Sequence, residues 1–74
     1  MNFQQTIEAL QQRWPGVPIG ATALGGQYYD RAVGITDYQQ VDDYWYVGHG
    51  INGKEMWVYY SEKKNVICCG DKET

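Results

Sequence analysis

The most chemically suggestive stretch of this chain is "GHGINGKE", residues 48–55. Gly48, Gly53 and Lys54 match the first part of a phosphate-binding loop, but Glu55 stands where that motif has Ser or Thr. Such a loop holds phosphates with backbone N–H groups, and a helix that begins at the lysine directs its dipole at them. The residues after Lys54, "EMWVYYS", are largely aromatic or β-branched and predict a strand instead. We therefore expect no nucleotide site and no other cofactor.

The other reactive side chains give no catalytic motif. His49, the one histidine, falls in a strand-like stretch, so we expect a hydrogen-bonded sheet residue rather than a base. Cys68 and Cys69 are adjacent and would point to opposite faces of a strand, which predicts reduced, structural thiols. One histidine and two neighbouring cysteines are too few for a zinc site, and the aspartates between positions 37 and 43 lack calcium-loop spacing. We expect no catalytic residue, no metal site and no enzyme.

Length and charge narrow the class of protein. A chain of 74 residues is enough for a single small α+β domain over residues 1–74. A net charge of −3 disfavours nucleic acid and anionic membranes, because both select for clustered Lys and Arg. No apolar run approaches the ~18–20 residues that span a bilayer, and the N-terminus has no secretory pattern. We expect a cytoplasmic protein that contacts neither nucleic acid nor membrane.

The N-terminal residues predict an amphipathic helix. Asn2 and Gln5 have the spacing of a capping box. Four large apolar side chains follow at helical spacing: Phe3, Ile7, Leu10 and Trp14. The prolines of "WPGVP" end the helix because proline cannot continue it. We expect the apolar side of this helix to cover one face of a sheet.

The segment 19–43 carries weaker signals. "GATALGG" is compatible with a short strand or a loop. "QYYDRAVGIT" alternates, with Tyr29, Val33 and Ile35 on one side, and predicts a strand. "TDYQQVDD" predicts a turn or a single helical turn, because Thr36 and Gln39 have capping-box spacing.

The last third of the chain predicts a hairpin and one further strand. Asn52-Gly53 is the sequence of a tight two-residue turn, which would place Val47 opposite Val58 and Trp45 opposite Tyr60. A polar turn, "SEKKN", then leads to the strand "VICC". The expected fold is α+β: one N-terminal amphipathic helix packed on an antiparallel sheet of three to five strands, with a C-terminal hairpin meander.

Both faces of this hairpin carry large side chains, although a half-exposed sheet should alternate apolar and polar residues. The more aliphatic row is expected under the helix: Trp45, Val47, Met56, Val58 and Tyr60. The opposite row is expected to bind a partner, with a shallow depression at its glycine: Tyr44, Tyr46, Trp57, Tyr59 and Gly48. The alternative is a solvated sheet face, since Tyr has a high β-propensity and a polar tip.

These features predict a non-enzymatic, small, acidic protein-binding module that acts through its aromatic sheet face. An inhibitor, an immunity protein or an adaptor would suit this composition, including the kinds encoded by phages and mobile elements. The expected partner is another protein, and a basic surface would suit the acidic chain. The alternative is a homo-oligomer that binds a small molecule on the same face, with aromatic rings stacked on a planar ligand.

Overall fold

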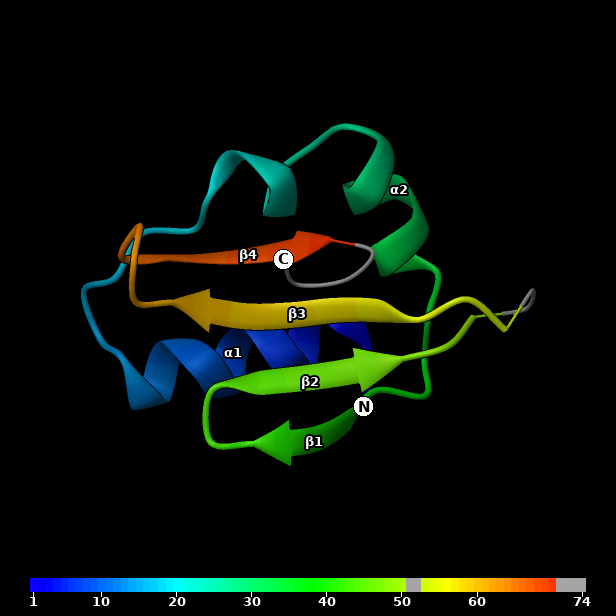
Figure 1. Cartoon of the computed structure of the whole chain (residues 1–74), viewed down its shortest axis with the longest axis horizontal. Coiled ribbons are helices and arrows are strands. Elements are labelled where there is room, and N and C mark those ends of the chain that lie inside the picture. Colours follow the sequence, from blue (N-terminus) through cyan, green and yellow to red (C-terminus); the bar gives the residue numbers. More distant parts are fainter. Residues whose placement is uncertain (51–52, 71–74) are drawn as a thin grey trace.

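A computed structural model describes residues 1–50 and 53–70 of the chain. Along the chain its elements are α1 (Phe3–Arg13), the 3₁₀ helix η1 (Ala21–Ala23), α2 (Gln27–Val33), β1 (Gln39–Asp42), β2 (Trp45–Gly48), β3 (Met56–Ser61) and β4 (Val66–Gly70). The strands form one antiparallel sheet in the order β1-β2-β3-β4, and α1 crosses behind it in Figure 1. The predicted α+β fold is confirmed. No helix in the described ranges is long and apolar enough to cross a membrane.

Helix α1 begins where the capping box predicts. The Asn2 carboxamide oxygen accepts a hydrogen bond from the Gln5 amide at 2.8 Å, and the Asn2 amide donates to the Gln5 side chain at 2.9 Å. This exchange satisfies two of the N–H groups that a helix start leaves without partners. Phe3, Ile7 and Leu10 are buried against the sheet, as their spacing predicts.

The core lies between α1 and the rear face of the sheet, which we call the helix-side face. Five strand residues of this face are buried in the same cluster as the apolar side of α1: Tyr46, Met56, Val58, Ile67 and Cys69. At one end of the cluster Trp14 stacks on Tyr60, with ring centroids 4.6 Å apart. At the other end Tyr38 is 1% exposed and donates its hydroxyl hydrogen to the Ala32 carbonyl at 2.9 Å.

The strand predicted over "QYYDRAVGIT" is wrong, because residues 27–33 form α2. Tyr29 meets Phe3 edge to face at 5.7 Å, and Ala32, three residues later, is fully buried. Tyr29 and Val33 are also four residues apart, so the same letters satisfy a helical spacing. Val33, predicted on the same side as Ile35, is 47% exposed, whereas Ile35 is buried. Packing against α1 and β4 decides the outcome over local β-propensity.

The edges of the sheet differ. Residues 18–20 run beside β4: the Ile67 amide donates to the Pro18 carbonyl at 3.0 Å, and the Gly20 amide donates to the Ile67 carbonyl at 2.6 Å. "GATALGG" therefore follows a short bridge and contains η1. At the opposite edge, every residue of β1 is exposed, and the pairing with β2 is irregular between Gln40 and Asp42. Such irregularity makes β1 a poor template for adding another strand.

The predicted register of β2 against β3 is wrong by one residue. Gly48 pairs with Met56 and Val47 with Trp57, so residues 49–55 separate the two strands. The predicted two-residue turn was Asn52-Gly53, and Asn52 lies outside the described residues. The observed pairs, Gly48 with Met56 and Val47 with Trp57, are not the pairs that such a turn would give. A shift of one residue turns every side chain of β2 to the other face.

Candidate functional site

The face of the sheet turned away from α1 is the strongest candidate for a functional surface, and we call it the open face. Its position follows from strand alternation, because the neighbours of its residues in sequence lie in the core. Over β2 and β3 no helix of the described chain covers this face (Figure 1). The large or apolar side chains at the centre of the open face are those of Trp45, Val47, Trp57, Tyr59 and Cys68.

Aromatic rings pack against one another on the open face. The indoles of Trp45 and Trp57 stack diagonally across β2 and β3, with centroids 5.2 Å apart and planes 29° from parallel. Tyr44, just before β2, meets Trp45 edge to face at 5.1 Å. Tyr59 lies between its pairing partners Trp45 and Cys68. Strand pairing fixes the backbones of these residues, so the face presents a preformed aromatic surface.

Burial on the open face is uneven. Val47 and Cys68 are buried, although neither belongs to the core cluster under α1. Trp45, Trp57 and Tyr59 are half-buried. The indole nitrogens of both tryptophans are buried, and no hydrogen-bond acceptor for them is found in the described part of the chain. A buried donor without an acceptor costs about 1–3 kcal/mol, so an acceptor brought to either indole would be stabilising.

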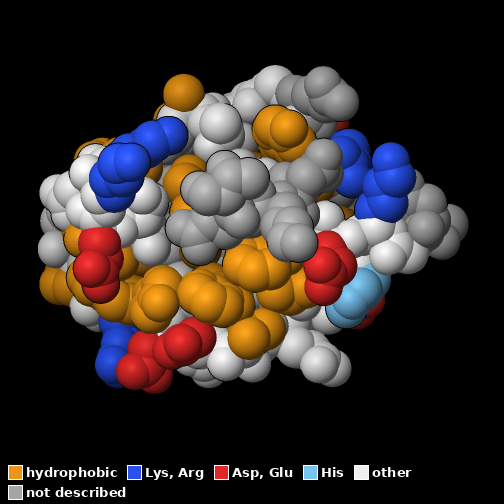
Figure 2. Space-filling model, in the orientation of Figure 1, with side chains coloured by type: hydrophobic (Ala, Val, Ile, Leu, Met, Phe, Trp, Pro, Cys, Tyr) orange, Lys and Arg blue, Asp and Glu red, His pale blue; other side chains and the backbone are white. Residues whose placement is uncertain are grey.

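Acidic side chains flank the aromatic surface. In Figure 2 a row of hydrophobic side chains crosses the molecule over β2 and β3, with acidic side chains at its left and right ends. In the sequence, Asp42 and Asp43 immediately precede Tyr44, and Glu55 precedes β3. Asp43 forms an ion pair with Arg13 of α1 at 3.2 Å. The open face therefore combines an apolar centre with a charged border, in which Lys and Arg side chains also appear on the left and right of the molecule in Figure 2.

The five residues predicted to form the contact surface do not share one face. Trp57 and Tyr59 lie on the open face as expected. Tyr46 and Gly48 lie on the helix-side face, where Tyr46 is 6% exposed, and this correction follows from the register shift. Tyr44 lies outside the strand but contacts the open face through Trp45. Which of these residues bind a partner stays a prediction.

The sequence reasoning missed Trp45 and Val47, both of which it assigned to the core. In the observed register Trp45 pairs with Tyr59 and Val47 with Trp57, so both side chains join the open face. The depression expected at Gly48 is also wrong, since Ile35 and Tyr38 fill the space above it. The glycine beside Trp57 is Gly70.

The segment that resembles a phosphate-binding loop is followed by a strand. β3 begins at Met56, two residues after Lys54, so the described chain places no helix N-terminus at this lysine. His49 lies just past β2, where its amide donates to the Asp37 carboxylate at 2.9 Å. This hydrogen bond lowers the pKa of Asp37 below its usual value, and the nearby His49 side chain adds a smaller effect. The pair anchors the chain where β2 ends.

The two cysteines lie on opposite faces of β4, as predicted. Cys69 pairs with Val58 and faces the core, whereas Cys68 pairs with Tyr59 and faces the open side. Neither forms a disulfide, and the Cys69 thiol donates to the Thr22 carbonyl at 3.1 Å. Within residues 1–50 and 53–70, no three His, Cys, Asp or Glu side chains are grouped to hold a metal ion.

Comparisons of the chain with protein-family models, with curated proteins and with solved structures found no match. The function is therefore inferred from the chemistry of the molecule's own surfaces. Two features carry it: the aromatic stack on the open face and the acidic residues around it.

Proposed function

We propose that this chain is a non-enzymatic protein-binding module whose contact surface is the open face. The observation that carries the proposal is the Trp45–Trp57 stack, beside Tyr59, on a sheet face that α1 leaves uncovered. Trp and Tyr are enriched among the residues that dominate binding energies at protein interfaces. Rings held by strand pairing lose little conformational freedom on binding, and this lowers the entropic cost of association.

The open face could supply the apolar centre of an interface but not a whole interface. A fully covered aromatic side chain buries about 150–250 Å², but Trp45, Trp57 and Tyr59 are already half-buried, so a partner would cover only the part of each ring that is still exposed. A stable interface buries about 800 Å² per partner, with a polar rim around an apolar centre. In our proposal Trp45, Trp57 and Tyr59 form that centre, and the acidic ends seen in Figure 2 contribute to the rim.

The charge pattern favours a partner that is apolar in the middle and basic around it. Acidic residues near both ends of the aromatic row would attract Lys and Arg, and the net charge of −3 acts in the same direction. Association should therefore slow as salt is raised.

In this proposal the chain is an inhibitor, an immunity protein or an adaptor of the cytoplasm. No catalytic step is required for such a role. Self-association through the open face is the competing outcome, and the net charge of −3 on each copy acts against it.

The test uses two serine variants on the open face and one matched control. Purified chain, Trp57→Ser and Tyr59→Ser are used to capture proteins from the source cells, and affinities are measured for the purified partner. Tyr28→Ser is the control, because Tyr28 is 37% exposed on α2. At least one open-face variant should weaken binding by ~2 kcal/mol or more, about 30-fold, whereas the control should not.

Light scattering coupled to size exclusion separates partner binding from self-association. A monomer at micromolar concentration that captures a partner supports the proposal. A stable dimer that Trp57→Ser dissociates would replace the proposal with self-association. Equal binding by all variants, each shown to be folded by circular dichroism, would remove the open face from the function.

A further inference from the structure

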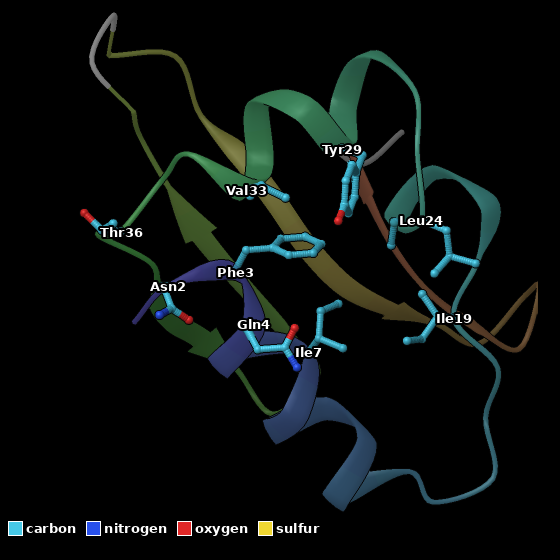
Figure 3. A pocket seen from close by; sticks show the side chains of 10 residues that line it. Asn2, Phe3, Gln4, Ile7, Ile19, Leu24, Tyr29, Val33 and Thr36 are labelled. Atoms are coloured by element: carbon cyan, nitrogen blue, oxygen red, sulfur yellow. The ribbon is translucent and has the colours of Figure 1, made fainter.

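A second candidate site lies in the helical layer, away from the open face. A pocket of about 450 Å³ opens between α1, η1 and α2. Figure 3 shows side chains of α1, of α2 and of the segments on either side of η1 around it, with Thr36 at its edge and its hydroxyl turned away. Most of its wall is apolar: Phe3, Ile7, Ile19, Ala23, Leu24 and Val33.

The polar groups of this pocket are few and uncharged. They come from Asn2, Gln4, Tyr29 and Thr36. The side chains of Asn2 and Gln4 already bond within α1, to Gln5 and Glu8. The hydroxyl of Tyr29 points into the pocket in Figure 3, and no hydrogen bond of this hydroxyl is found within the described ranges. It is therefore the polar group best placed to meet a ligand.

Two apolar side chains at this pocket are strongly exposed. Leu24 is 64% exposed and Val33 is 47% exposed, and both line the pocket. Covering them removes apolar surface from water, which is worth roughly 25 cal/mol per Å². The pocket thus combines an apolar interior, an apolar rim and one inward hydroxyl.

We propose that this pocket binds a neutral, mainly apolar small molecule that carries one hydrogen-bonding group, with Tyr29 as its polar contact. The volume lies within the ~300–1,000 Å³ typical of small-molecule sites, which are mostly apolar with a few placed polar groups. A charged ligand is disfavoured, because among the described residues no charged side chain lines the pocket to offset the cost of desolvating it. This site is separate from the open face and does not depend on the function proposed for that face.

The test compares two dyes that share an aromatic body and differ in charge. N-phenyl-1-naphthylamine is neutral, and 8-anilino-1-naphthalenesulfonate carries a sulfonate. In 0.5 M NaCl, which screens the net charge of the protein, the neutral dye should bind at least tenfold more tightly. Stronger binding of the sulfonate would overturn the proposal, as would binding of neither dye.

Matched variants then locate the neutral dye. Leu24→Asp places a charge at the rim, and Val41→Asp places one on β1, where Val41 is 57% exposed and does not line the pocket. The first should reduce affinity tenfold or more and the second should leave it unchanged. Tyr29→Phe keeps the contact with Phe3 but loses the hydroxyl, so affinity should fall about two- to tenfold.

Methyl resonances distinguish this pocket from the open face. On addition of the neutral dye, the methyl signals of Ile7, Leu24 and Val33 should shift, and that of Val47 should not. Trp57→Ser should leave the dye affinity unchanged. If instead Val47 shifts and Trp57→Ser abolishes dye binding, the dye occupies the open face and the pocket proposal is wrong.

Discussion

The side chain of Tyr38 lies directly against the backbone of Gly48. A Cβ placed on Gly48 would come 2.8 Å from Cδ1 of the Tyr38 ring and 2.6 Å from Cγ2 of Ile35. The ring cannot move aside easily, because it is 1% exposed and its hydroxyl is bonded to the Ala32 carbonyl. Position 48 therefore takes glycine for a steric reason, and this contact holds β2 with Tyr46 facing the core.

We predict that Gly48→Ala destabilises the protein by about 1–3 kcal/mol, the usual cost of overpacking a core. Gly70→Ala is the matched control: a Cβ there would meet no atom of the described residues within 4 Å. Denaturant unfolding measures both variants. A Gly48→Ala protein as stable as wild type would show that β2 faces the other way, as the sequence pattern suggested.

We predict that Leu10→Ala lowers the free energy of unfolding by roughly 2–5 kcal/mol. Leu10 is 1% exposed on the buried side of α1, and removal of its side chain leaves a cavity. Gln11→Ala, the next position along the helix, is exposed and should change the free energy of unfolding by less than about 0.5 kcal/mol. Equal denaturation midpoints for the two variants would mean that α1 is not docked on the sheet.

The sequence predicts α1, β3 and β4 well for a physical reason. The capping pair Asn2–Gln5 and the apolar spacing of α1 are local signals, and local hydrogen bonds confirm them. In β4 the adjacent cysteines must face opposite sides of any strand they occupy. Elements of this kind are specified mainly by their own residues.

The faces of the sheet could not be predicted in the same way. Large side chains occupy every position from Tyr44 to Val47 and from Met56 to Tyr60, so either register gives two apolar faces. What selects the register is distant in sequence. Ile35 and Tyr38 fill the space above Gly48. The His49 amide donates its hydrogen bond to the Asp37 carboxylate, so this amide is not available to pair with another strand. The candidate site was therefore half predicted, with Trp57 and Tyr59 placed correctly and Trp45 missed.

We predict that Asp37 adds to stability above its unfolded pKa, near 3.8, and that this contribution is lost at lower pH. The sign follows from the hydrogen bond of the His49 amide, which lowers the folded-state pKa of Asp37. Asp37→Asn keeps an acceptor oxygen but removes the ionisation. Between pH 6 and pH 2 the free energy of unfolding should fall less in this variant than in wild type. Parallel curves would contradict the prediction.

We predict that Cys69 makes the protein less stable in alkali. Burial raises the pKa of this thiol to about 11, from a usual value of 9.0, and the neighbouring Cys68 adds to the shift. Below pH 9 the thiol is protonated in both states, so its full contribution is present. Between pH 9 and 11 the unfolded chain loses the proton first, and stability falls as pH rises.

The measurement for Cys69 is the free energy of unfolding at pH 7, 9 and 10.5 in the presence of a reductant. Wild type should lose more stability over this range than Cys69→Ala does. The pKa of Tyr38 is raised first by burial and then by the charge of Cys69, so the difference between the two proteins includes this coupling as well as the thiol itself. An equal loss in both would mean that the Cys69 thiol reaches water in the native state, and that its bond to the Thr22 carbonyl does not hold it in the core.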